Sequence, residues 1–167
     1  VEHYFSILED LLIAYRIPVF TKRAKRRMAA HPKFYFFDVG VYRTLRPKGP
    51  LDMPEQIEGI SFETLFLQEL MAVNDGFNLG YSFYYWRTSH NTEIDFVLYG
   101  DRGIRAFEVK RTGRVMKPMT NTLASFCKDY PMAKAYFIYG GKRTMREGVV
   151  DIMPLVDALK ALPDILS

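Results

Sequence analysis

The chain has 167 residues, of which 49% are hydrophobic and 25% are charged. This composition is too apolar for a disordered chain, and the length suits one compact domain with its own core. The 23 Lys and Arg residues exceed the 19 Asp and Glu residues by four, so the chain is mildly basic. A charge of that sign is compatible with a polyanionic partner but does not identify one.

No apolar run approaches the roughly 20 residues that a membrane-spanning helix needs, and we find no signal-peptide pattern. The single cysteine, Cys127, cannot form an internal disulfide, which favours a reducing compartment. We therefore expect a cytoplasmic protein with no membrane partner. The chain starts with Val1 inside a helical pattern, so we also expect it to be a piece of a longer protein.

The first quarter of the chain predicts a helix, a basic run, a strand and a second helix. Apolar residues at helical spacing place an amphipathic helix over residues 3–14, which ends before Pro18. Five positive charges follow, and they indicate either a solvated face or a phosphate-binding patch: Lys22, Arg23, Lys25, Arg26 and Arg27. We then expect an aromatic strand over 34–37 and a short helix over 39–45, before a loop rich in Pro and Gly.

A longer helix is expected to begin near Ser61, a suitable N-cap, with Glu63 in its first turn. An acid there also suits the positive end of the helix dipole, so a structural role for Glu63 stands beside any catalytic one. From residue 81 the apolar period changes to two, which predicts strands over 81–87, 93–99 and 104–110.

The end of the chain predicts a helix over 117–130, a fourth strand over 133–139 and a closing helix over 154–162. A strand, helix, strand order predicts that the fourth strand lies parallel to its neighbour. The expected fold class is therefore α/β, a mixed sheet of at least four strands flanked by helices.

Three of the charged residues in the hairpin at residues 93–110 stand where a hydrophobic core is expected: Asp95, Glu108 and Lys110. If residues 100–103 form the turn, Tyr99 pairs with Ile104 and Asp95 falls opposite Glu108. Two facing carboxylates repel each other unless a cation lies between them. Oxygen ligands without a His or Cys companion favour Mg²⁺ or Mn²⁺ over zinc. The hairpin alone leaves a second reading open, a salt bridge within the sheet between Lys110 and Glu108.

The order helix, three strands, helix, strand, with Asp95 before a turn and "EVK" at 108–110 after it, resembles the PD-(D/E)XK nuclease superfamily. This resemblance covers residues 59 to about 140 and implies a restriction-endonuclease-like core. It implies that Asp95 and Glu108 are metal ligands, with the Val109 carbonyl as a further ligand, that Lys110 is the catalytic lysine and that Glu63 is an auxiliary acid. Ile94 stands where some members have proline.

Four stretches together resemble one branch more closely: KFYFFDVGVYRTL, GISFETLFLQEL, YYWRT and TEIDFVL…FEVKRT. They are similar to the C-terminal domain, of unassigned function, that follows the ATPase domain in a group of prokaryotic AAA+-type ATPases. This implies an N-terminal extension over 1–58, a nuclease-like domain over 59–167 and an upstream ATPase domain in the same chain. ATP would bind only that upstream domain, because "YFIYGGKRT" lacks the first glycine and the hydroxyl residue of a P-loop.

The resulting hypothesis is a Mg²⁺-dependent nuclease, or phosphodiesterase, that acts on DNA. Its phosphate contacts would come from the basic run and from four further residues: Arg87, Arg111, Arg114 and Lys117. Arg87 has another reading, a pair with Glu93 or Asp95. The alternative function is a catalytically inactive nuclease-fold module that serves the ATPase as a DNA-binding or protein-docking platform, because a fold does not imply its chemistry.

Overall fold

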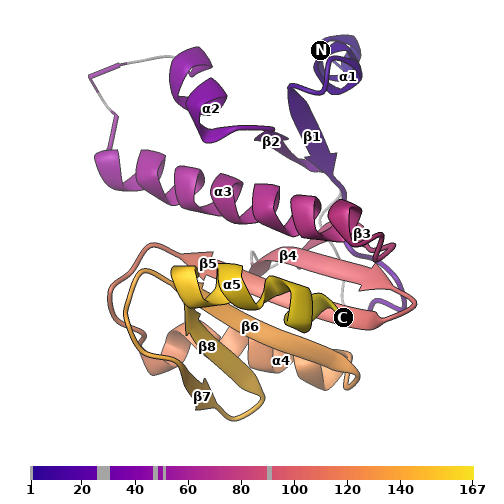
Figure 1. Cartoon of the computed structure of the whole chain (residues 1–167), viewed down its shortest axis with the longest axis vertical. Helices are drawn as coiled ribbons and strands as arrows, with labels where there is room; N and C mark the ends of the chain where they lie inside the picture. The colour runs from indigo at the N-terminus through magenta and orange to yellow at the C-terminus, as the bar shows by residue number, and fades with distance from the viewer. Residues whose placement is uncertain (1, 26–30, 47–48, 51, 90–91) are drawn as a thin grey trace.

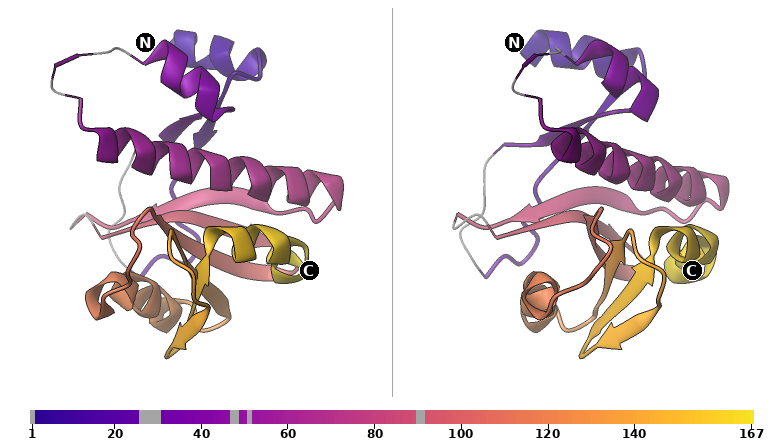
Figure 2. Two further views of the ribbon diagram at one scale, coloured as in Figure 1. Left: turned by 60° about the vertical axis from the view of Figure 1, so that its left-hand side comes forward. Right: turned by 90° about the vertical axis from the view of Figure 1, so that its left-hand side faces the viewer.

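The computed structural model describes residues 2–25, 31–46, 49–50, 52–89 and 92–167 (Figure 1). Its centre is a six-stranded mixed sheet with the strand order β3-β4-β5-β6-β8-β7. Helices cover both faces of this sheet, α3 and α5 on one and α4 on the other (Figures 1 and 2). The expected α/β fold class is therefore confirmed at the level of a mixed sheet flanked by helices.

The N-terminal part lies on the far side of α3 from this sheet (Figure 1). It consists of α1 (Glu2–Asp10), the antiparallel strands β1 (Ala14–Ile17) and β2 (Lys33–Phe36), and α2 (Val39–Leu45). Asp38 caps α2, because its side chain accepts hydrogen bonds from the N–H groups of Gly40 and Val41. The expected helix over 3–14 was too long: Leu12 has a positive φ of 56°, and β1 follows.

The long helix α3 (Pro54–Gly76) begins seven residues earlier than expected. Pro54 occupies the first helical position and Glu55 lies in the first turn, two features typical of a helix start. Ser61 is therefore not an N-cap; it is buried inside the helix, and its hydroxyl donates to the Ile57 carbonyl at 2.7 Å. Glu63 consequently lies beyond the first turn, where the helix dipole does not explain an acid.

The hairpin strands form close to where the apolar period places them. They are β3 (Ser82–Arg87), β4 (Glu93–Gly100) and β5 (Gly103–Lys110), and β4 is antiparallel to both β3 and β5. Tyr99 pairs with Ile104 as expected, since the turn between Gly100 and Gly103 fixes the register. Gly103 has a φ of 107°, a conformation that disfavours other residues in this turn.

After β5, a short 3₁₀ turn (Lys117–Thr120) leads into α4 (Asn121–Asp129), and then β6 (Ala133–Tyr139) runs parallel to β5 as predicted. Two strands were not predicted, β7 (Met145–Glu147) and β8 (Val150–Pro154). Both are short, and β8 alternates buried and half-buried residues for only five positions. The closing helix α5 is Leu155–Leu166, four residues longer at its end than expected.

Apolar side chains fill both sides of the sheet. Phe66 of α3 is fully buried on one side, where its ring contacts Phe96 of β4 and Phe107 of β5. Phe126 of α4 is equally buried on the other side, against Trp86 of β3. Within the described ranges, no helix combines the length and apolarity needed to cross a membrane.

Replacing Phe66 by Ala should lower the free energy of unfolding by about 3–5 kcal/mol, because a fully buried ring leaves a cavity. The matched control is Phe77→Ala just after the same helix, where the ring is 62% exposed; its effect should stay within about 0.5 kcal/mol. Urea denaturation monitored by circular dichroism measures both. Equal effects of the two substitutions would contradict the packing of α3 on the sheet.

Candidate active site

A β-bulge in β4 places Asp95 at an irregular point of the sheet. The register between β3 and β4 shifts by one residue, so Asp95 and Phe96 together oppose Tyr85. Bulges re-aim side chains and locally interrupt pairing, and they are common next to active sites. The regular ladder between β4 and β5 also ends at Phe96 and Phe107, one step before the expected pair of Asp95 with Glu108.

Beyond the end of this ladder, the carboxylate of Asp95 serves as the hydrogen-bond partner of the β5 backbone. Its Oδ2 accepts a hydrogen bond of 2.9 Å from the Val109 N–H and lies 3.6 Å from the Lys110 ammonium. The residue is only 3% exposed. The side chain of Asp95 thus joins β4 to β5 at Val109, the residue between Glu108 and Lys110.

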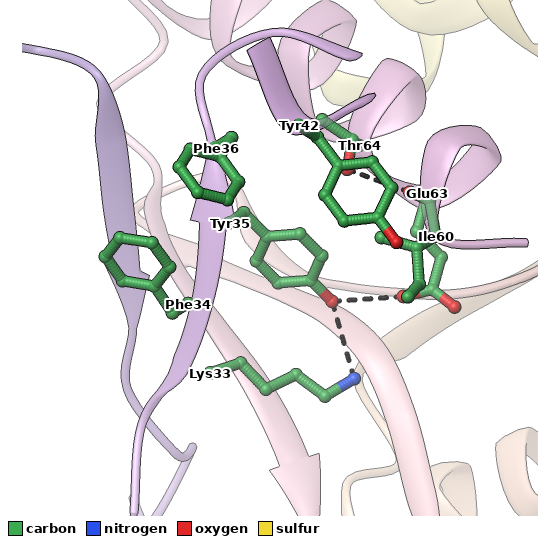
Figure 3. A pocket seen from close by; sticks show the side chains of 8 residues that line it. All are labelled: Lys33, Phe34, Tyr35, Phe36, Tyr42, Ile60, Glu63 and Thr64. Atoms are coloured by element: carbon green, nitrogen blue, oxygen red, sulfur yellow. Dashed lines mark hydrogen bonds between the residues drawn. The ribbon is translucent and has the colours of Figure 1, made fainter. Parts of the chain in front are cut away.

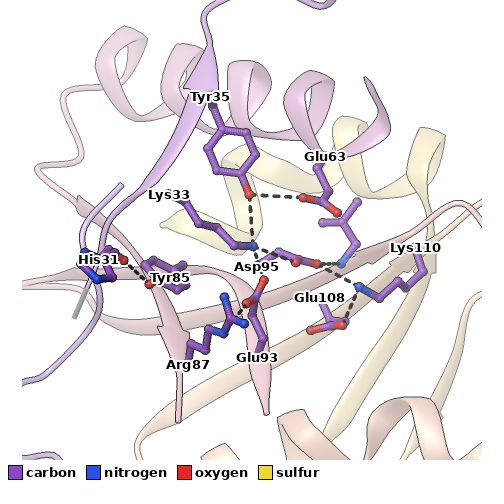
Figure 4. Close-up of polar contacts among 11 residues, drawn as sticks. His31, Lys33, Tyr35, Glu63, Tyr85, Arg87, Glu93, Asp95, Glu108 and Lys110 are labelled. Carbon is purple, nitrogen blue, oxygen red and sulfur yellow. Dashed lines mark hydrogen bonds and ion pairs between the residues drawn. The ribbon is translucent and has the colours of Figure 1, made fainter. Parts of the chain in front are cut away.

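Glu108 carries the least satisfied oxygen of this group. Its Oε1 lies 2.9 Å from the Lys110 nitrogen. Its Oε2 is buried and has no hydrogen-bond partner, a condition shared among the described side chains only by the Tyr81 hydroxyl. Burial, and then the charge of Asp95, raise the pKa of Glu108 to about 8. The three residues singled out in the hairpin therefore lie together, as Figure 4 shows.

Glu63 reaches the same cluster from α3. Its Oε2 accepts a hydrogen bond of 3.2 Å from the Tyr35 hydroxyl of β2. Burial and the charge of Asp95 raise the pKa of Glu63 to about 7. Burial and the nearby carboxylates, Glu63 first among them, also raise the pKa of Tyr35, so its hydroxyl stays a donor at neutral pH.

Lys33 of β2 is a member of the cluster that sequence reasoning missed (Figure 4). Its ammonium forms an ion pair with Glu93 and lies 3.5 Å from Asp95 Oδ1. It also donates to the Tyr35 hydroxyl at 3.4 Å. Burial alone would lower the pKa of Lys33, but Asp95 and Glu93 raise it overall. The available signal was the spacing of Lys33 and Tyr35, two apart and hence on one face of their strand.

Lys110 balances the other side of the carboxylates. Burial alone would lower its pKa, whereas Asp95 and Glu108 raise it above the ordinary value. The ammonium is therefore charged at neutral pH and stands between two acids. A positive group in this position is able to offset negative charge that develops on a bound anion.

A pocket of about 300 Å³ opens beside Glu63, between β2, α2 and α3 (Figure 3). Aromatic rings form much of its wall, and the carboxylate of Glu63 and the ammonium of Lys33 lie at its edge. The residues that line it are Lys33, Phe34, Tyr35, Phe36, Tyr42, Ile60, Glu63 and Thr64. Glu63 and Lys33 therefore face this pocket, whereas Asp95 and Glu108 are not among the described residues that line it.

The fit of a metal ion to these residues is partial. In the part of the chain that the structure describes, no three Asp, Glu, His or Cys side chains lie close enough together to form a complete metal site. Asp95 and Glu108 nevertheless supply two buried carboxylates and one unpartnered oxygen. The Val109 carbonyl faces β4, because the N–H and C=O of a strand residue point to the same neighbour. These oxygens are the donors that Mg²⁺ prefers.

The residues expected to contact nucleic acid do not all lie near this cluster. The Lys22 ammonium lies 4.2 Å from the centre of the Tyr99 ring, which is about 13 Å along β4 from Asp95. Arg87 lies 3.4 Å from Glu93 at the edge of the cluster, which is the ion pair that its alternative reading expects; a phosphate contact of Arg87 stays a prediction. Arg111 forms an ion pair with Glu58. Arg23, Lys25, Arg114 and Lys117 are exposed, and Arg26 and Arg27 lie outside the described residues.

Comparison with known proteins places two family models on the chain. Residues 58–157 match the family described as Domain of unknown function (DUF4143), and residues 1–52 match Domain of unknown function (DUF8612). Asp95, Glu108 and Lys110 therefore fall within the first match, whereas Lys33 falls within the second.

Two curated relatives are Uncharacterized protein Rv2008c of Mycobacterium tuberculosis and Uncharacterized protein Mb2031c of Mycobacterium bovis. Each is 26% identical to this chain over 162 residues, which is 96% of this chain and 34% of the relative. The chain thus spans about a third of the length of these relatives. No solved structure matches it.

The stability of the metal-free protein should fall as the pH rises from about 5 to 8, in part because of Glu108. Its folded-state pKa of about 8 exceeds the ordinary 4.5, so the folded state holds the proton more tightly. That contribution is complete below pH 4.5 and is lost as the pH passes the folded-state value. Glu63 acts in the same direction, with a pKa of about 7. Melting temperatures in EDTA across this range measure the effect.

Glu108→Gln should flatten this pH dependence, because the amide does not titrate. Glu55→Gln, an exposed substitution in the first turn of α3, is the control and should keep the parent's pH dependence. An unchanged slope in Glu108→Gln would show that this carboxyl is not buried among like charges.

Lys33→Met should destabilise the protein by roughly 1–3 kcal/mol, because it leaves the half-buried Glu93 and the buried Asp95 without their shared ammonium. The matched control is Lys134→Met on β6, where the lysine is exposed and should contribute little. Chemical denaturation at pH 7 compares the two. A loss no larger than that of the control would mean that Lys33 is solvated and is not part of the cluster.

Proposed function

This chain belongs to the family described as Domain of unknown function (DUF4143), and we propose that it is a nuclease-like module in which Asp95 and Glu108 hold Mg²⁺ or Mn²⁺ for phosphodiester hydrolysis. One observation carries the proposal: Glu108 Oε2 is buried without a partner beside an ammonium that contacts two carboxylates. A buried carboxyl oxygen without a partner costs free energy, and more so when the carboxyl is ionised. A divalent cation would satisfy it.

Each residue of the cluster has a chemical use in such a reaction. A bound divalent ion polarises a phosphate and lowers the pKa of a coordinated water. Asp95, Glu108 and the Val109 carbonyl would hold the ion, and Lys110 would offset charge on the phosphate oxygens. Glu63, whose pKa is raised to about 7, has the proton affinity that suits transfer of a proton near neutral pH.

The order of elements supports the proposed membership of the PD-(D/E)XK superfamily. An acid-bearing helix (α3) precedes three antiparallel strands (β3 to β5), and a helix (α4) leads to a parallel strand (β6). On this proposal the substrate is DNA, the partner is an ATPase domain upstream in the same protein, and the setting is the cytoplasm of a prokaryote.

A second candidate function, a docking platform without catalysis, is favoured by a different observation. Asp95 is already engaged by Lys33, Lys110 and the Val109 N–H. Glu63 is likewise occupied by Tyr35. A cluster whose carboxylates are engaged in this way holds the fold together without a metal, and the module would then be a binding surface for DNA or for the ATPase.

Lys110→Ala and Asp95→Asn separate the two functions. In a working nuclease, Lys110→Ala should keep Mn²⁺ binding but reduce cleavage by about 10²- to 10³-fold, because a charge contact in the transition state is lost. Asp95→Asn should lose both binding and cleavage. Calorimetric titration with Mn²⁺ and cleavage of labelled single- and double-stranded DNA and RNA give the two readouts, in this chain and in the longer protein.

The control for both variants is Lys134→Ala, an exposed lysine at the far end of β6, which should behave as the parent. The absence of Mn²⁺ binding and of cleavage in the parent would reject the nuclease and leave the docking platform.

A further inference from the structure

An open hollow of about 730 Å³ lies between the segments that follow β5 and β6. We call it the basic hollow, because its charged lining residues are Arg114, Lys142 and Arg143. All three side chains are exposed, and no acidic residue is among the described residues that line the hollow. Net positive charge in a concave space favours an anionic ligand.

The wall of the basic hollow is fixed by hydrogen bonds. The Tyr139 hydroxyl donates to the Arg143 carbonyl at 2.8 Å and accepts from the Arg143 N–H at 3.1 Å. The Gly140 N–H donates to the Thr112 carbonyl at 2.9 Å, which joins the two segments. These bonds hold the backbone that carries Arg143 in one position.

Glycine is required at Gly141 by the same arrangement. A Cβ atom at this position would collide with the Tyr139 ring, and one at Gly140 would lie 3.2 Å from the Thr112 carbonyl. The two glycines therefore let the β6–β7 segment lie close against the segment after β5. The close packing that these two glycines allow gives the wall beneath the exposed cations a defined shape.

The basic hollow lies at the same end of the sheet as the carboxylate cluster. Tyr139 is the register partner of Lys110 in the parallel ladder between β5 and β6, and neighbouring strands lie about 4.8 Å apart. A linear ligand bound in the hollow would therefore pass close to Lys110. Lys22, by contrast, lies at the opposite end of β4.

We propose that the basic hollow binds consecutive phosphate groups of a nucleic-acid strand through Arg114, Lys142 and Arg143. Three cations around one open space suit a chain of phosphates, whereas a flat lipid surface does not fit a concave site. The inference rests on the proposed function for the place of the reacting phosphate, but the binding itself needs no metal. Lys142 and Arg143 are thereby assigned to substrate binding.

The test is the double variant Lys142→Gln/Arg143→Gln, measured by fluorescence anisotropy with labelled 20-mer single-stranded and duplex DNA in EDTA over a range of NaCl concentrations. Two lost phosphate contacts should reduce the slope of log K against log salt by about 1.4 for single strands or 1.8 for duplex. The charge-matched control is Lys134→Gln/Lys160→Gln, two exposed lysines outside the hollow, which should keep the parent's slope.

Gly141→Ala provides a variant with every charge intact. Its added methyl group should displace the segment and weaken DNA binding, while circular dichroism and the melting temperature report whether the fold is retained. The proposal is overturned if the parent does not bind DNA, if the charge-matched control loses as much as the Lys142/Arg143 variant, or if anionic vesicles compete better than DNA.

These results separate the basic hollow from the metal site. A parent that binds DNA through the hollow but does not cleave it supports this inference and rejects the nuclease. If the parent cleaves DNA and the Lys142/Arg143 variant binds DNA as tightly as the parent does, DNA binding by the basic hollow is rejected but the nuclease proposal is not.

Discussion

The hydrogen bond from the Val109 N–H to the Asp95 carboxylate is the contact on which the candidate site depends. It forms where the ladder between β4 and β5 ends, so a side chain completes what backbone pairing leaves open. Because Val109 stands between Glu108 and Lys110, the same bond sets how far these two lie from Asp95. The β-bulge, the hairpin and the charged cluster are consequently one structural unit.

Burial makes it unfavourable for all the acids of this unit to be ionised together. Four acids (Glu63, Glu93, Asp95 and Glu108) face the two lysines Lys33 and Lys110, with Arg87 at the rim. The acids are in excess, and the low-dielectric surroundings raise the pKa of Glu63 and Glu108 rather than leaving both ionised. Such a cluster holds either a proton or an added cation at neutral pH, which is a property of metal-dependent hydrolytic sites and of pH-sensitive binding surfaces alike.

Local sequence patterns were sufficient to predict the strands and the turn of the hairpin. They were not sufficient to predict the parts of the chain that pack around it. The four-residue turn fixed the pairing of Tyr99 with Ile104, and a period of two located β3, β4 and β5 within one residue. The spacing of Lys33 and Tyr35 placed both on one face of their strand, but the contact of Lys33 with Asp95 was not predictable, because it forms only through tertiary packing across about 60 residues of sequence. The start of α3 was misplaced because Pro54 was read as part of a loop, although proline is also typical of the first helical position.

The ion pairs of Lys33 cross the boundary between two family segments. Lys33 belongs to residues 1–52, and its acidic partners Glu93 and Asp95 belong to residues 58–157. A gene fusion that brought only the second segment into another protein would inherit the acids without this counter-charge. The two segments are therefore under a shared electrostatic constraint, and a change of sign at Lys33 in one would call for compensation among the acids of the other.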